Sequence, residues 1–315
     1  MLEFTSVLTS DDVRLNVVQT GNPHGPAIVF IHGISQSWMS WIAQLTDPLL
    51  RAKYRMVAFD LRGHGTSQGS HAAVDNKSAQ SEAPTDAAHG DGQPKPADLA
   101  VAHDLHAVIA GLGLSAPTVI GWSYGGAVLQ DYIAVRGGLA GIGKAVLLAT
   151  SPVVLAPGHA DGGADSVFSA AAIATLLKTT PFNPYTGELN SHADIAAGLT
   201  GFVELCYQDE LSRTAPDAAQ VQGVTGFNLF TPAAMRLAII GRVFDHRPML
   251  AVLSASDKAR IRIVSPQGDK VLQPTRIDQY WSETGLALDT VDGEGHLFHY
   301  RNAAEFNSRL PSWIA

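Results

Sequence analysis

The sequence predicts an α/β fold in which helices pack against a doubly wound, mostly parallel β-sheet, with a helical insertion over one edge. Three observations favour this class. Short apolar runs of strand length alternate with segments of helix length along most of the chain. Residues 27–31 are continuously apolar, as expected for a strand that is buried on both faces. Residues 152–247 carry mainly helical patterns between two strand-like runs, which indicates the insertion.

Seven segments carry strand signals, either as short apolar runs or as alternating patterns. In chain order they are residues 13–20, 27–31, 55–60, 118–121, 144–149, 260–264 and 286–291. Residues 98–112 form the clearest helical pattern between them. Because strands that alternate with helices usually join through right-handed crossovers, we expect a parallel sheet with helices on both faces.

Two stretches interrupt the alternation and define the predicted domain organisation. Residues 69–96 contain almost no large apolar side chain, which predicts a mobile surface loop within the core domain. Residues 152–247 contain helical patterns at 164–177, 191–211 and 231–243. We expect residues 152–247 to form a helical cap over the carboxyl edge of the sheet, where α/β proteins bind ligands. Residues 1–151 and 248–315 would then form the core domain.

Composition excludes several classes of function. The 315 residues are 46% hydrophobic, and 21 basic against 29 acidic residues give a net charge of −8. This balance lacks the excess of basic residues that would attract nucleic acid or an anionic membrane. The chain has no apparent signal peptide or membrane-spanning run, so a soluble cytoplasmic protein is the expectation. One cysteine, Cys206, excludes an internal disulfide and a multi-thiolate zinc site. The oligomeric state is left open.

Residues 121–126, with the sequence GWSYGG, are the most informative motif. They place Ser123 between glycines where a predicted strand turns into a predicted helix, which is the pattern of a nucleophile elbow. Gly121 and Gly125 are expected to relieve collisions with the neighbouring strand and helix. The serine would lie at a helix N-terminus, which favours the negative charge that develops in acyl transfer.

A serine nucleophile needs a base, and His296 is the best candidate of the twelve histidines. It follows the last predicted strand in a glycine-rich loop that can carry an imidazole over the sheet edge. His299 is the nearest competitor, and His32 is better suited to shaping its own loop. A His-x-x-His pair without a third ligand is weak support for metal binding, so no metal site and no cofactor are expected.

The imidazole in turn needs an acid to fix its tautomer. Asp269 follows the predicted strand at 260–264 and gives the chain order Ser, Asp, His. Asp292 remains the alternative because it is close in sequence to His296. For the oxyanion, the backbone amide of Tyr124 at the elbow and that of Ile34, after the strand at 27–31, are the predicted donors.

Together these features resemble the α/β-hydrolase family, specifically its capped, cofactor-independent serine members. The resemblance covers nearly the whole chain and rests on motifs in order: His32-Gly33 with Trp41 downstream, residues 60–67 (DLRGHGTS), the elbow at Ser123, and Gly295-His296 followed by residues 305–307. It implies a structural turn rather than chemistry for residues 60–67. It also implies the two oxyanion donors already argued above.

The predicted function is hydrolysis of a small-molecule carboxylic ester or lactone through an acyl-enzyme on Ser123. Trp122 is expected to contact the substrate because it adjoins Ser123, and an apolar or aromatic acyl group follows from that expectation. The same triad would also serve carbon–carbon bond hydrolysis, amide hydrolysis, acyl transfer or cofactor-free haloperoxidation. A different class is a ligand-binding receptor on the same scaffold without useful turnover.

Overall fold

An eight-stranded sheet forms the centre of the computed structural model, which describes residues 1–69, 96–154, 166–183, 186–211 and 216–315. Its strands run in the order β1-β2-β4-β3-β5-β6-β9-β10. Their bounds are β1 Glu3–Leu8, β2 Arg14–Gly21, β3 Ala27–Ile31, β4 Arg55–Phe59, β5 Thr118–Trp122, β6 Lys144–Leu148, β9 Ile261–Pro266 and β10 Ala287–Val291. From β4 to β10 all neighbouring strands are parallel, whereas β1 and β2 pair antiparallel at one edge. The predicted mostly parallel sheet is confirmed.

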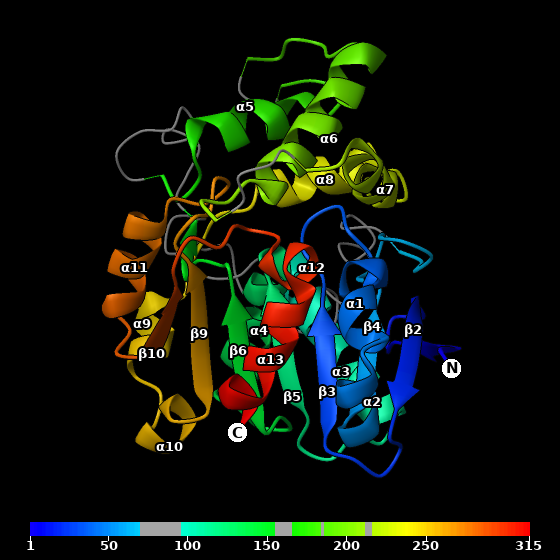
Figure 1. Ribbon diagram of the computed structural model, residues 1–315, viewed down its shortest axis with the longest axis vertical. Coiled ribbons are helices and arrows are strands. Elements are labelled where there is room, and N and C mark those ends of the chain that lie inside the picture. The colour runs from blue at the N-terminus through cyan, green and yellow to red at the C-terminus, as the bar shows by residue number, and fades with distance from the viewer. Residues whose placement is uncertain (70–95, 155–165, 184–185, 212–215) are drawn as a thin grey trace.

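Helices cover both faces of this sheet (Figure 1). In the view of Figure 1, α12 and α13 lie in front of the sheet, and α3 and α4 lie behind it. Outside residues 155–243, the helical elements are η1 Trp38–Trp41, α1 Ile42–Leu45, α2 Pro48–Lys53, α3 Pro96–Gly111, α4 Tyr124–Arg136, α9 Arg247–Ala251, α10 Ala255–Lys258, α11 Pro274–Ser282, α12 Phe298–Arg301 and α13 Ala303–Ile314. The central strands are buried on both sides, which is why residues 27–31 are apolar throughout.

Four of the helices between β6 and β9 stand above the carboxyl ends of the parallel strands (Figure 1). They are α5 Ala170–Lys178, α6 His192–Tyr207, α7 Ala218–Asn228 and α8 Ala233–Ile240, and we call them the insertion helices. Ser191 caps α6 with a reciprocal capping box through Asp194. A two-stranded ribbon of β7 Val153–Val154 and β8 Phe244–Asp245 joins the two ends of this segment. The insertion therefore leaves and re-enters the sheet region at one place.

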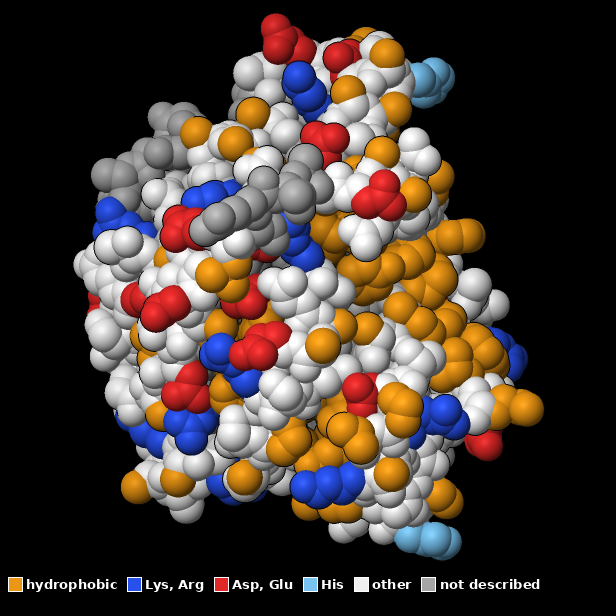
Figure 2. Space-filling view, viewed as in Figure 1, with side chains coloured by type: hydrophobic (Ala, Val, Ile, Leu, Met, Phe, Trp, Pro, Cys, Tyr) orange, Lys and Arg blue, Asp and Glu red, His pale blue; other side chains and the backbone are white. Residues whose placement is uncertain are grey.

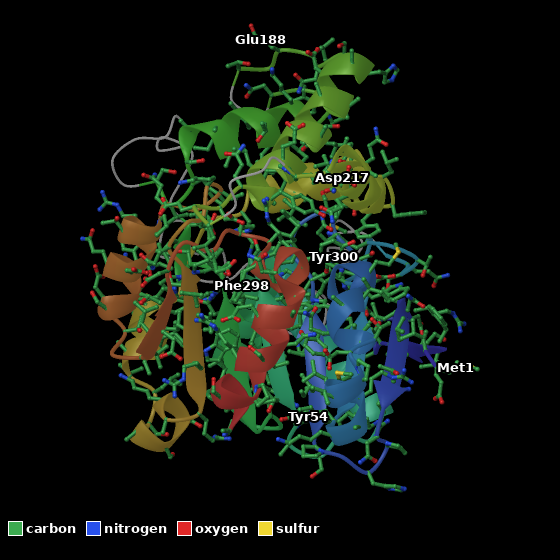
Figure 3. All side chains as sticks on the ribbon, in the orientation of Figure 1. Met1, Tyr54, Glu188, Asp217, Phe298 and Tyr300 are labelled. Atoms are coloured by element: carbon green, nitrogen blue, oxygen red, sulfur yellow. The ribbon has the colours of Figure 1, made fainter. Side chains whose placement is uncertain are left out.

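Aromatic contacts tie the insertion helices to the sheet region. Tyr300 of α12 meets Tyr207 and Phe227 edge to face, with ring centroids 6.4 and 6.5 Å apart. Figure 3 shows Tyr300 and Phe298 where the sheet region meets these helices. Figure 2 shows hydrophobic side chains gathered on the surface below α7, and Leu229 and Phe230 in the turn after α7 are exposed.

Several elements differ from the sequence-based expectations. The strand β1, the short β7 and β8, and the helix α7 were not predicted, and α5 begins at Ala170 rather than at residue 164. The predicted mobile loop 69–96 lies outside the described residues except at its two ends. Within the described ranges, no single helix has the length and apolar composition needed to cross a membrane. The helices α7 and α8 have the necessary length and apolar composition only when they are taken together, and a bend of 89° separates them.

Candidate active site

The elbow places Ser123 between β5 and α4 in a conformation that few residues adopt. Its φ of 54° and ψ of −119° lie outside the usual regions, and its amide donates to Leu148 O at 2.9 Å. A Cβ added to Gly121 would lie 2.4 Å from Gly125 O, and one added to Gly125 would lie 2.5 Å from Ile31 O. Only glycine fits at these two positions, so the turn exists because both are glycine.

Ser123, His296 and Asp269 form one continuous chain of polar contacts. His296 Nε2 lies 3.0 Å from Ser123 Oγ, and His296 Nδ1 lies 2.7 Å from Asp269 Oδ2. Asp269 Oδ1 accepts hydrogen bonds from the amides of Val271 and Leu272 at 2.8 and 2.9 Å. Because Asp269 and His296 are buried, these contacts are shielded from water. The geometry is that of a serine, its base and the acid that orients the base.

The loops that carry Asp269 and His296 are bound to each other and to α6. The amide of Gly268 donates to Glu294 O at 2.7 Å, and that of Leu297 donates to Cys206 O at 3.0 Å. Asp292, the alternative acid, is exposed to solvent in the turn after β10. Of the two candidate carboxylates, the structure places Asp269 against His296.

The other two histidines considered as bases are buried elsewhere. His32 Nε2 accepts from the amide of Leu61 at 3.0 Å, and Nδ1 lies 2.8 Å from Gly33 O, so the ring shapes its own loop. Burial lowers the pKa of His32 to about 4. His299 is fully buried between two tryptophans, and burial, followed by the nearby His296, lowers its pKa well below the ordinary value. Both rings are therefore neutral near pH 7.

The two predicted oxyanion donors lie beside Ser123. Ile34 and Tyr124 line the same cavity as the serine. Tyr124 is the first residue of α4, and the amides of such residues point out of the helix end. Ile34 is followed by Ser35 with a φ of 58°, a tight turn directly after β3. The arrangement brings the N-terminus of α4 and the loop after β3 to the cavity that Ser123 lines, and the roles of the two amides stay a prediction.

A largely apolar cavity of about 130 Å³ opens onto Ser123. The insertion helices supply much of its wall, through Ile173, Leu176, Leu177, Phe202, Ile239 and Ile240. Phe168, Phe244, Val271 and Leu272 line it as well. Among the described residues of this wall, Arg242 carries a charge, and its Nη2 lies 2.5 Å from Asp131 Oδ1. The sequence pattern indicated these helices but did not identify which of their apolar faces meets the cavity.

Trp122 is not among the described residues that line this cavity, and its role as a substrate-binding residue stays a prediction. The side chain is buried, and its Nε1 donates to His296 O at 2.8 Å. β5 ends at Trp122 and the backbone turns sharply at Ser123, so proximity in sequence does not place the two side chains in the same space.

Among the described residues, no three or more His, Cys, Asp or Glu side chains gather in a way that could hold a metal ion.

Comparison with known proteins gives the family. A family model described as the alpha/beta hydrolase family matches residues 28–309. This chain belongs to the alpha/beta hydrolase family. The prediction of family and of fold class is confirmed, and the prediction of a hydrolase enzyme agrees with it.

Epoxide hydrolases and esterases are among the proteins that this hydrolase resembles. Epoxide hydrolase 1 from Caenorhabditis elegans is 34% identical over 121 residues, which are 38% of this chain and 24% of that protein. The chain thus spans only about a quarter of that relative. Among solved structures, the esterase RhEst1 from Rhodococcus sp. ECU1013 has a TM-score of 0.74 at 22% identity and covers 99% of this chain and 98% of its own. An esterase from Exiguobacterium antarcticum has a TM-score of 0.71 at 19% identity, with 99% of each chain covered. At these identities the solved structures establish the fold.

Proposed function

We propose that this chain is a serine hydrolase that cleaves a small-molecule carboxylic ester or lactone through an acyl-enzyme on Ser123. The observation that supports it most is the contact chain from Ser123 through His296 to Asp269 at the edge of an apolar cavity. A serine hydroxyl becomes a good nucleophile only when a base takes its proton, and His296 Nε2 is within reach of that proton.

The acylation step follows from these contacts. Ser123 Oγ attacks the carbonyl carbon while its proton passes to His296 Nε2, and Asp269 stabilises the imidazolium through Nδ1. The carbonyl oxygen gains negative charge and is stabilised by the amides of Ile34 and Tyr124. Each such donor contributes about 3 to 4 kcal/mol in known cases. His296 then protonates the leaving alkoxide, and the carbon–oxygen bond breaks.

Deacylation repeats the steps of acylation with a water molecule in place of the serine hydroxyl. His296 removes a proton from a water molecule, which attacks the acyl-enzyme, and Ser123 leaves with the proton that His296 returns. An ester gives an acid and an alcohol. A lactone gives a single hydroxy acid because its leaving alcohol stays attached to the acyl group.

The cavity favours an apolar acyl group. Ile173, Leu176, Phe202 and Phe244 offer carbon surface, and burying each methylene of a substrate contributes about 0.8 kcal/mol. The proposed substrate class is therefore esters or lactones with an aliphatic or aromatic acyl group rather than short, strongly polar acids.

The nucleophile argues against an epoxide as the substrate, although matched relatives carry the name epoxide hydrolase. Attack of Ser123 on an epoxide carbon would leave an ether on the serine, and the groups at this site have no means of cleaving it. Attack on a carbonyl leaves an ester, which water cleaves with help from His296. The serine thus supports carbonyl substrates.

Two experiments test the proposal. A fluorophosphonate probe is expected to label wild type at Ser123 and to spare Ser123→Ala. Turnover of aryl and alkyl esters, a lactone and a vinylogous diketone is then compared. Ester turnover that survives in Ser123→Ala would exclude the proposed acyl-enzyme. Turnover confined to the diketone would assign carbon–carbon bond hydrolysis, and a preference for short polar acids would contradict the apolar acyl site.

A further inference from the structure

Trp122 touches three parts of the candidate active site at once. It is the last residue of β5 and directly precedes Ser123. Its indole N–H donates to the main-chain oxygen of His296 at 2.8 Å. A methyl group added at Gly33 would lie 3.0 Å from Cζ3 of Trp122, so the indole packs against the loop that carries Ile34.

The indole itself is held by a buried aromatic stack. The ring of His299 lies 4.6 Å from Trp122 and 4.3 Å from Trp41, measured between centroids. His299 is fully buried, and the pKa shift described above keeps it neutral, so it adds no charge beside His296. Gln44 of α1 holds the main chain of His299 by donating to His299 O at 2.7 Å. The indole therefore has little freedom to turn.

We infer that Trp122 is a positioning residue that fixes the main chain of His296 relative to Ser123 and to the Ile34 loop. Asp269 fixes the rotation of the His296 imidazole, but it does not hold the main chain that carries the ring. The backbone bonds from Gly268 to Glu294 and from Leu297 to Cys206 hold the neighbouring residues, whereas the bond from Trp122 holds His296 itself and ties its main chain to the strand that precedes the nucleophile. A shift of about 1 Å between reacting groups can lower a rate about a hundredfold.

This inference rests on the proposed function and makes a prediction of its own about kinetics. Trp122→Phe keeps an aromatic ring but removes the donor to His296 O. Because Trp122 lies outside the cavity, we expect kcat to fall about tenfold with KM unchanged. The fall in kcat should be the same for esters with different acyl groups. The rate constant for fluorophosphonate labelling should fall by a similar factor.

Trp41→Phe is the matched control. Trp41 belongs to the same stack and is fully buried, yet its Nε1 donates to no group among the described residues. The same substitution there changes packing beside His299 without removing a bond to the His296 loop. We expect kcat in Trp41→Phe to stay within about twofold of wild type even if its melting temperature falls.

A second variant guards against poor folding of Trp122→Phe. Replacing Trp122 with its benzothiophene analogue substitutes sulfur for the N–H group and keeps the shape of the ring. A fall in kcat at constant KM in either Trp122 variant supports the positioning role. A raised KM with kcat unchanged would assign Trp122 to substrate contact, and unchanged kinetics would leave it a packing residue. Both results overturn the inference while Ser123 labelling still supports the hydrolase. If wild type is not labelled at Ser123, the proposed function fails instead, and the inference fails with it.

Discussion

Asp269 uses its two carboxylate oxygens for different partners: Oδ2 faces His296 Nδ1, and Oδ1 accepts two backbone amides. This division fixes how an amide substitution would behave. In Asp269→Asn the side-chain oxygen would keep the amides of Val271 and Leu272, so the NH2 group would face His296. The imidazole would then carry its proton on Nε2 and could not accept one from Ser123.

We therefore expect Asp269→Asn to fold normally and to lower kcat by about four orders of magnitude. Esterase kinetics at pH 7 measure the loss, and a thermal melt checks the fold. Asp292→Asn is the control because Asp292 is exposed, and its activity should match that of wild type. A large loss in Asp292→Asn with a small one in Asp269→Asn would reverse the assignment of the acid.

Gly121→Ala should prevent the elbow from forming. The added methyl would lie 2.4 Å from Gly125 O, which is backbone and cannot rotate away. Overpacking of this kind costs about 1 to 3 kcal/mol or more, so we expect a lower midpoint of urea unfolding and loss of fluorophosphonate labelling.

Gly223→Ala provides the opposite case. Gly223 lies in α7 and a methyl there meets nothing within 4 Å, so the substitution should raise the free energy of unfolding by about 0.5 to 1 kcal/mol. Equal effects of the two substitutions would contradict the steric account of Gly121.

Ile173→Trp should shorten the acyl groups that the enzyme accepts. Ile173 lines the cavity from α5, so a larger side chain there removes space that a long acyl chain would need. We expect kcat/KM for an octanoate ester to fall at least tenfold while that for an acetate ester is nearly unchanged. Ala174→Trp, at an exposed position of the same helix, should leave the ratio of the two unaltered. An equal loss for both esters would show that α5 does not set acyl length.

Stability should fall below pH 6.5 because of His32. Its folded-state pKa of about 4 is lower than the ordinary 6.5 of an unfolded chain, so between these values the unfolded state binds more protons. The free energy of unfolding thus decreases as pH falls from 6.5 to 4, by about 3 kcal/mol for this group. Above pH 6.5 the titration of His32 does not change the free energy of unfolding with pH.

Melting temperatures of wild type and His32→Gln between pH 7 and pH 4 test this expectation. The glutamine oxygen can still accept from the Leu61 amide but does not titrate. Its melting temperature should decline less steeply with acidification than that of wild type. Parallel curves would show that His32 does not govern acid stability.

The central strands could be predicted because their burial on both faces leaves continuous apolar runs in the sequence. The strand β1 lacks this signal, since five of its six residues are exposed and only Val7 is buried. The ribbon of β7 and β8 has two residues in each strand, which is too short for any periodicity. In α7 the two glycines at 223 and 226 weaken the helical pattern, and tertiary packing decides the helix instead.

The residues of the candidate site also differ in how well the sequence could predict them. Ser123 and its glycines could be found because the elbow's backbone demands those residues in that order. Choosing Asp269 over Asp292 depended on which loop bends toward His296, which spacing alone does not encode. The contact of the Trp122 indole with the His296 main chain could not be predicted, because nearness to Ser123 along the chain does not say where the side chain points.

The insertion separates two kinds of evolutionary change. Ser123, Asp269 and His296, with the amides of Ile34 and Tyr124, all come from outside the insertion helices, whereas much of the cavity wall comes from within them. If the proposed function holds, we expect substitutions in α5, α6 and α8 to change which acyl group is accepted while Ser123, His296 and Asp269 keep their geometry. Under that proposal, paralogues that differ mainly in this segment would catalyse one reaction on different substrates.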